Sequence, residues 1–187
     1  MDNSTVGERV LYRGRAEMKD DDFTLAIMLG AMAVECELAF MFFKWTRIDM
    51  KMKMSNLGAD IKITQGHEDA WEKQYRNWFR ITEKLDNVSQ HLTGLDFDIY
   101  TGRTPLAELM RSNHPESIGK SAKKFFEEHL FWKRNQIVHS GKVDFAKDEA
   151  EQCLALASTI FSIMKAMDRE RNNRTFSAQG VTPTGSS

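Results

Sequence analysis

A nearly continuous apolar run between Phe23 and Trp45 limits the folds open to this chain more than any other feature. Three aspartates at 20–22 precede it, and aspartates cap a helix and favour its positive end. We therefore expect a helix from Asp22 to about Met50. Its apolar residues lie on every face, so it must be covered on every face. In a chain of 187 residues this favours an all-α domain that associates with a second copy.

The same apolar run is long enough to resemble a membrane span, but two acidic residues argue against that interpretation. Glu35 and Glu37 lie near its centre, where an acidic side chain costs about 2.5–3.5 kcal/mol on insertion scales. The first residues lack the basic and apolar regions of a secretory signal. We expect a cytoplasmic protein with no membrane partner, in which Cys36 and Cys153 are reduced core residues.

Helix breakers are rare, with three prolines and eleven glycines in the whole chain. The length suits one compact domain, and long stretches free of breakers favour helices over a sheet. We divide the chain into an N-terminal segment at 1–21 that can form a short helix, a helical domain at 22–170, and a disordered tail at 171–187. Within the domain we predict helices over 22–50, 67–91, 105–111, 117–139 and 145–169, with a loop at 93–104.

The predicted helix over 67–91 carries an aromatic stripe. It consists of Trp71, Tyr75, Trp78 and Phe79 at helical spacing. Exposed rings of this kind can stack on RNA bases, but a stripe with this spacing is more often part of the core. The core interpretation is therefore preferred.

The near balance of charge excludes one class of nucleic-acid-binding protein. The chain has 26 Lys and Arg residues against 27 Asp and Glu residues. A protein that coats nucleic acid nonspecifically takes its affinity from a broadly basic surface, which this composition does not supply. An enzyme that contacts a few phosphates at one cleft remains compatible with it.

The string from Arg134 to Gly141 combines a permanent cation, an amide and an imidazole where a helix is expected to end. It reads Arg134-Asn135-Gln136-Ile137-Val138-His139-Ser140-Gly141. These groups can bind a phosphodiester and move a proton near neutral pH. The bare Arg-x4-His spacing is a weak signal, whereas the longer string between two amphipathic helices is more specific.

Helical geometry restricts how the motif can act. At 100° per residue, Asn135 and His139 share a face, while Arg134 and His139 are about 140° apart around the helix. Arg134 and His139 converge on one phosphate only if the helix ends or bends near His139, or if a second subunit supplies one of the pair. The spacing therefore predicts a composite site at a dimer interface.

This string resembles the Arg-x4-His signature of HEPN domains, which are all-α nucleotide-handling modules that include RNA-cleaving toxins and defence effectors. The resemblance implies an antiparallel bundle of four to six helices and a metal-independent endoribonuclease without a cofactor. It also implies an RNA substrate, a homodimer in which two motifs face each other, and an antitoxin or defence protein as partner. One HEPN toxin family carries a modified Tyr two residues after the His, where this chain has Gly141.

Under this interpretation each motif residue has a role. Arg134 clamps the phosphate, His139 acts as general base or general acid, and Asn135 orients His139 or binds a phosphate oxygen. Glu35 is a candidate supporting acid, because an acid in an apolar helix should have a partner, and Arg134 or His139 would provide one. The other histidines form no ligand cluster, so no metal site is expected.

The alternative is a noncatalytic helical module that dimerises or binds a partner or RNA. In that case the motif is structural. His139 then caps the helix end, and Arg134 pairs with an acid chosen from Glu35, Glu127, Glu128 and Asp144.

Overall fold

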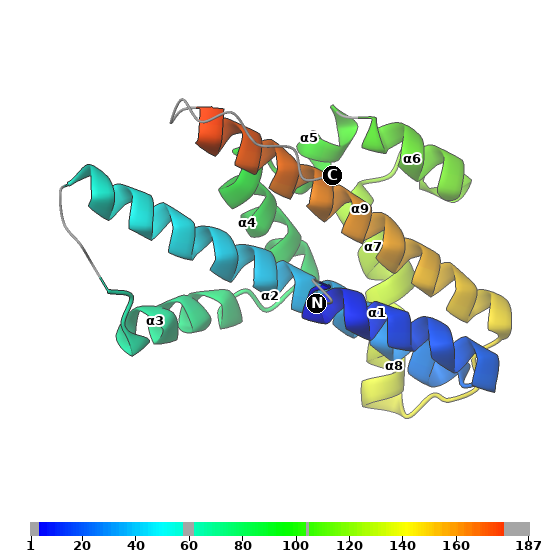
Figure 1. Cartoon of the computed structure of the whole chain (residues 1–187). Helices are drawn as coiled ribbons and strands as arrows, with labels where there is room; N and C mark the ends of the chain where they lie inside the picture. The colour runs from blue at the N-terminus through cyan, green and yellow to red at the C-terminus, as the bar shows by residue number, and fades with distance from the viewer. Residues whose placement is uncertain (1–3, 58–61, 104, 178–187) are drawn as a thin grey trace.

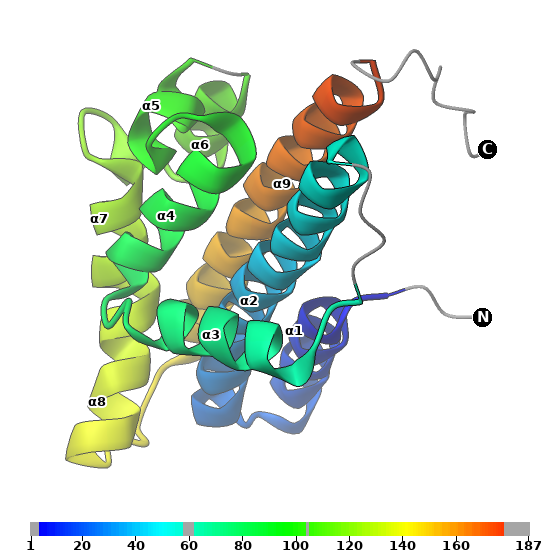
Figure 2. The same ribbon diagram turned by 90° about the vertical axis from the view of Figure 1, so that its left-hand side faces the viewer.

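The structure is a computed structural model that describes residues 4–57, 62–103 and 105–177, and every regular element within them is helical (Figure 1). The predicted all-α bundle is therefore confirmed. Two layers face each other (Figure 2). One layer contains α1 (Val6–Glu17), α2 (Phe23–Asn56) and α9 (Lys147–Ser177), and the other is built mainly from α4 (Ile81–Thr93), α5 (Phe97–Gly102), α6 (Leu106–Asn113), α7 (Ala122–Phe126) and α8 (Trp132–Ser140).

The two longest helices, α2 and α9, run parallel to each other (Figure 1). A Cβ atom at Gly30 of α2 would lie 3.3 Å from Leu154 of α9. About four turns further along both helices, Lys44 Nζ and Trp45 Nε1 lie 2.6 and 2.7 Å from Asp168 Oδ1. The helices between α2 and α9 return the chain to the end of the bundle at which α2 begins.

Helix α2 begins where the sequence predicts. Asp22 caps it and accepts a hydrogen bond from the Leu25 amide at 2.9 Å. Most of its apolar side chains are buried, but Leu25 and Met32 remain 38% and 43% exposed. By length and composition α2 could cross a membrane, and 56% of its most apolar window is buried inside the bundle.

The predicted helix over 67–91 is wrong, because the chain forms two helices there. α3 (Gln65–Arg76) ends before a turn, and α4 starts anew at Ile81. The Glu83 carboxylate accepts a hydrogen bond from the Arg80 amide and fixes this second start. The break takes the aromatic stripe out of register, so Tyr75 is buried while Phe79 is 87% exposed.

The predicted loop at 93–104 is also wrong, since α5 lies within it. Phe97 and Tyr100 share one face of this short helix and are 1% and 3% exposed. The Phe97 amide donates a hydrogen bond to Asp86 Oδ1 at 3.1 Å, which ties the start of α5 to α4. Burial of these two rings outweighs the glycines and polar residues on which the loop prediction rested.

The predicted helix over 117–139 begins later and is irregular. Ser121 caps α7, and a π-helical turn at Glu127–Phe131 separates α7 from α8. Ile118 and Val138, both apolar residues within the predicted range, are 64% and 48% exposed. Ile118 precedes the cap, and α8 has solvent along one side, which explains both exposures.

The ends of the predicted domain need one correction. Residues 171–177 belong to α9 and not to a disordered tail, while residues 178–187 lie outside the described residues. Arg171 Nη2 lies 2.6 Å from Asp49 Oδ1, and the Arg174 guanidinium donates to backbone carbonyls at the end of α4. Polar contacts between helices therefore stabilise this segment, whose sequence has little to bury.

Candidate functional site

The three motif residues lie on α8, whose last turn is at the periphery of the bundle (Figure 2). The helix ends at Ser140, and Gly141 adopts a left-handed conformation with φ 64°. The Gly141 amide donates to the Ile137 carbonyl at 3.1 Å, which closes the helix. A glycine adopts this conformation without strain because it has no Cβ atom. As the sequence predicts, α8 ends one residue after His139.

His139 is exposed in this last turn. In the part of the chain that the structure describes, its imidazole has no hydrogen-bond or ion-pair partner. The side chain lies seven residues, or two helical turns, from Trp132, so the two share a face, and Trp132 is 61% exposed. The imidazole is therefore open to solvent and to a ligand.

Arg134 is half-buried and lacks a carboxylate partner. Its Nη1 donates to Asn135 Oδ1 at 2.9 Å, and its Nε is buried with no hydrogen-bond partner. Across residues 4–57, 62–103 and 105–177, no acid lies within ion-pair distance of this guanidinium. The preceding residue differs, since Lys133 Nζ lies 3.0 Å from Glu149 Oε1. The charge of Arg134 is thus available to an anion.

The structure brings Arg134 and Asn135 together but leaves His139 apart. α8 is a regular helix from Trp132 to Ser140, so Arg134 and His139 keep the separation of about 140° around the axis. Asn135 is bound to Arg134, and no hydrogen bond joins it to His139 among the described residues. A single chain therefore does not direct the cation and the imidazole at one point.

Glu35, the candidate supporting acid, is half-buried on α2. Its backbone carbonyl accepts a hydrogen bond from the Tyr75 hydroxyl at 3.3 Å. Within the described ranges, its carboxylate forms no hydrogen bond or ion pair with Arg134 or His139. The deeply buried acid of α2 is instead Glu37, which is 1% exposed. Composition could not separate the two, because both lie in the same apolar run.

Groups that bind metals are not gathered in the described residues. No cluster of three or more His, Cys, Asp or Glu side chains could hold a metal ion there. Both cysteines are free. Cys153 is fully buried, its Sγ donates to the His129 carbonyl at 3.4 Å, and burial raises its pKa to about 12. Cys153 is a core residue as predicted, whereas Cys36 is half-buried.

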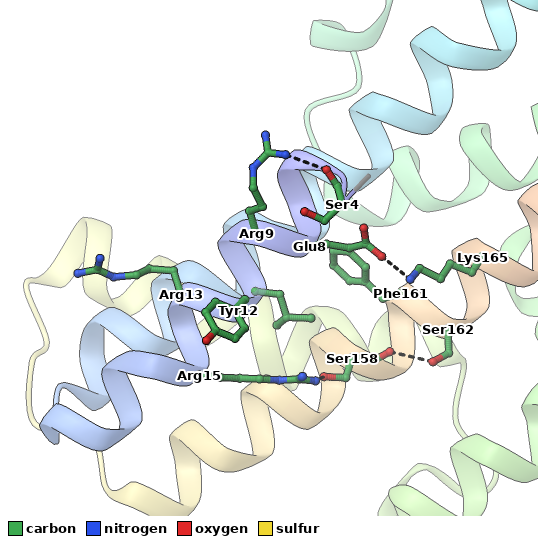
Figure 3. A pocket seen from close by; sticks show the side chains of 11 residues that line it. Ser4, Glu8, Arg9, Tyr12, Arg13, Arg15, Ser158, Phe161, Ser162 and Lys165 are labelled. Carbon is green, nitrogen blue, oxygen red and sulfur yellow. Dashed lines mark hydrogen bonds and ion pairs between the residues drawn. The ribbon is translucent and has the colours of Figure 1, made fainter. Parts of the chain in front are cut away.

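A second candidate site, which the sequence prediction missed, lies between α1 and α9. It is an open cavity of about 830 Å³ lined by Tyr12, Arg15 and Lys165 among others (Figure 3). The available signal was the spacing of Glu8, Tyr12 and Arg15 at i, i+4 and i+7, which places them on one helical face. The sequence of residues 1–21 predicts only a short helix and gives no sign of the α9 residues that face it.

Comparison with protein-family models, with curated proteins and with solved structures finds no match to this chain. The function proposed below is therefore inferred from the residues and geometry of these two sites.

Proposed function

We propose that this protein is a metal-independent endoribonuclease of the HEPN type that acts as a toxin or antiviral defence effector in the cytoplasm. One observation carries the proposal: Arg134 is half-buried without an acidic partner among the described residues, on the helix that exposes His139 at its end. Buried charged groups are normally paired. A phosphate of an RNA substrate would supply the missing partner.

A homodimer would resolve the separation between Arg134 and His139. Large apolar side chains flank the motif, with Trp132, Val138 and Val143 being 61%, 48% and 71% exposed. Gathered exposed apolar side chains mark interaction surfaces. In a twofold pairing the same surface of each subunit meets the other, so His139 of one protomer can approach Arg134 of its partner. The cleft between them would hold one scissile phosphate.

The proposed reaction uses the RNA 2′-hydroxyl as nucleophile. The O2′–P bond forms and the P–O5′ bond breaks, giving a 2′,3′-cyclic phosphate and a 5′-hydroxyl. One His139 accepts the proton of the 2′-hydroxyl, and the His139 of the second protomer donates a proton to the leaving O5′. Arg134 binds the nonbridging oxygens, whose charge grows in the transition state, and Asn135 holds the guanidinium in place.

The test is cleavage of end-labelled RNA by the purified protein in EDTA. We expect cyclic phosphate ends, and no cut where the nucleotide 5′ to the scissile bond carries a 2′-deoxy sugar. Arg134→Ala and His139→Ala should each reduce cleavage at least about a hundredfold, while Gln136→Ala on the same helix and Arg76→Ala on α3 retain it. Expression of the wild type should arrest growth, and His139→Ala should relieve the arrest. Cleavage that survives both motif substitutions would overturn the proposal.

A noncatalytic module that dimerises or binds a partner or RNA is the second candidate. It is favoured by the bond between Arg134 and Asn135, which occupies both motif side chains, and by the Gly141 cap, which closes the end of α8. Under this function the wild type leaves RNA intact. His139→Ala would then lower the melting temperature or weaken dimerisation without changing an activity.

A further inference from the structure

The cavity between α1 and α9 is locally basic although the whole chain has a net charge of −1. Four cationic side chains and one carboxylate line it. The cationic groups are Arg9, Arg13, Arg15 and Lys165, and the carboxylate is Glu8. Because the remainder of the chain is acidic, this concentration of positive charge marks a preferred position for an anion.

A row of polar side chains on α1 faces a row of polar side chains on α9 across the cavity (Figure 3). Lys165 of α9 forms an ion pair with Glu8 of α1 at one end, and Arg15 Nη2 of α1 donates to Ser158 Oγ of α9 at 2.7 Å at the other. The two bridges are seven residues apart on each helix, which is about 10 Å along the axes. The two rows of side chains therefore form the sides of a slot, and the length of this slot suits a small ligand with more than one polar group.

The arginines of the slot have charge available for a ligand. Arg15 donates to a neutral hydroxyl, and Arg9 Nη1 donates to the Ser4 carbonyl at 2.7 Å. Neither forms an ion pair with an acid in the described part of the chain. Lys165 and Arg13 differ, since Glu8 and Glu17 neutralise them. Guanidinium groups bind phosphate oxygens through two parallel donors, so Arg9 and Arg15 are the stronger anion ligands.

An aromatic ring and an apolar floor lie between the charged groups. Tyr12 is on α1 between the two bridges and is 77% exposed. The floor is formed by Leu11 and Phe161, which are 7% and 5% exposed. An exposed aromatic ring beside cations is the combination with which proteins stack a base and bind its phosphate. An acidic peptide would use the cations but not the ring.

We propose that this slot binds a nucleotide, with its phosphate on Arg15 and its base against Tyr12. Single-stranded RNA and a free nucleotide both present this chemistry. The proposal does not rest on the ribonuclease function, because the slot and the Arg134 to His139 motif share no residue.

The experiment measures binding by fluorescence anisotropy at about 50 mM salt, where phosphate contacts are strong. The probes are a labelled 2′-O-methyl RNA oligonucleotide, which lacks the nucleophilic hydroxyl and so cannot be cleaved, and a fluorescent ADP analogue. We expect Arg15→Ala and Tyr12→Ala each to weaken binding about tenfold. Tyr12→Phe should retain most of the affinity, because the ring remains. Arg76→Ala, which removes another exposed arginine, from α3, should bind as the wild type does.

The probes also separate the sources of the ligand. Binding of the RNA probe alone identifies a strand, and binding of the ADP analogue alone identifies a free nucleotide. The proposal is overturned if neither probe binds at about 1 mM, if Tyr12→Ala and Arg15→Ala bind like the wild type while melting normally, or if an acidic peptide binds more tightly than both probes. Binding of the ADP analogue and its loss in Tyr12→Ala and Arg15→Ala are measured without RNA cleavage, so failure of the slot and failure of the ribonuclease function are distinguishable.

Discussion

Thr5 and Glu37 are joined by a hydrogen bond in which the Thr5 hydroxyl donates to the Glu37 carboxylate. This bond connects the first residue before α1 to the middle of α2. Thr5 also caps α1, because its hydroxyl accepts from the Glu8 amide and the Glu8 carboxylate accepts from the Thr5 amide. The second oxygen of Glu37, Oε1, is buried without a partner among the described residues. The stability of the fold should therefore depend on whether the Glu37 carboxyl group is protonated.

Stability should fall as the pH rises above about 4.5 because of Glu37. Burial raises its pKa above the ordinary value of 4.5, the bond from Thr5 acts in the opposite direction, and the Glu8 and Asp168 carboxylates raise it further against the effect of Lys165. The folded state then binds this proton more tightly than the unfolded state does. The stabilisation is complete below 4.5 and is lost as the pH rises through the folded pKa.

Glu37→Gln should therefore flatten the decline of the melting temperature as the pH rises above about 4.5. Glu35→Gln, which alters a half-buried acid two residues away, is the matched control and should leave the decline unchanged. The pKa of Glu8 is lowered, first by its bond with Lys165, so its own contribution is lost only below 4.5 and does not overlap. Calorimetry that gives one slope for the wild type and Glu37→Gln would contradict this account.

Gly7→Ala should destabilise the protein by about 1–3 kcal/mol, as overpacking does in other cores. A Cβ atom at Gly7 would lie 2.7 Å from Glu37 Oε2 and 2.8 Å from the Ala33 carbonyl oxygen, which is closer than atoms pack. Alanine normally favours a helix by about 0.5–1 kcal/mol over glycine, so the clash must outweigh that gain. Gly102→Ala in α5, where a Cβ atom would meet nothing within 4 Å, should be neutral or stabilising. Urea unfolding of both variants measures the difference.

Local signals in the sequence predicted the elements that depend on a few neighbouring residues. Asp22 begins α2 and Gly141 ends α8, because a side-chain cap and a left-handed glycine act within one turn. The extension of α9 to Ser177 depends instead on contacts with residues that are distant in sequence. Arg174, for example, is held by carbonyls of α4 more than eighty residues away in sequence, and no local pattern reports such a contact.

The candidate sites also have some features that local sequence predicts and others that depend on distant residues. The position of Arg134 and His139 at a helix end follows from spacing, and so does their separation around the helix. The lack of an acidic partner for Arg134 could not be predicted from spacing. Four acids were plausible partners, and the described structure pairs none of them with it. The slot at Tyr12 and Arg15 also requires the side chains of α9 that face it, and these are more than 140 residues away in sequence.

Trp132→Glu should dissociate the proposed dimer and abolish RNA cleavage. Trp132 shares a helical face with His139 and is 61% exposed, and aromatic anchors at interface centres contribute about 2 kcal/mol or more. Burying a carboxylate there would add a desolvation penalty. Phe79→Glu is the control, because Phe79 is 87% exposed on the turn between α3 and α4. Sedimentation equilibrium should give a monomer for Trp132→Glu and a dimer for the control. Dimers of micromolar affinity form at about 100 μM. A wild type that stays monomeric at that concentration would exclude this interface.

Arg174→Ala should lower the free energy of unfolding by about 1 kcal/mol, the size of an ordinary hydrogen-bond contribution discounted for a side chain near the surface. The Arg174 guanidinium donates to the carbonyls of Leu92 and Thr93, which are among the last in α4 and lack helical partners of their own. Arg169→Ala on the same helix is the matched control, since within the described part of the chain Arg169 Nε bonds only the Lys165 carbonyl one turn away. Because the contact of Arg174 joins α9 to α4, hydrogen exchange at the end of α4 should accelerate in Arg174→Ala alone. Equal exchange in both variants would mean that α9 stabilises its last turns without α4.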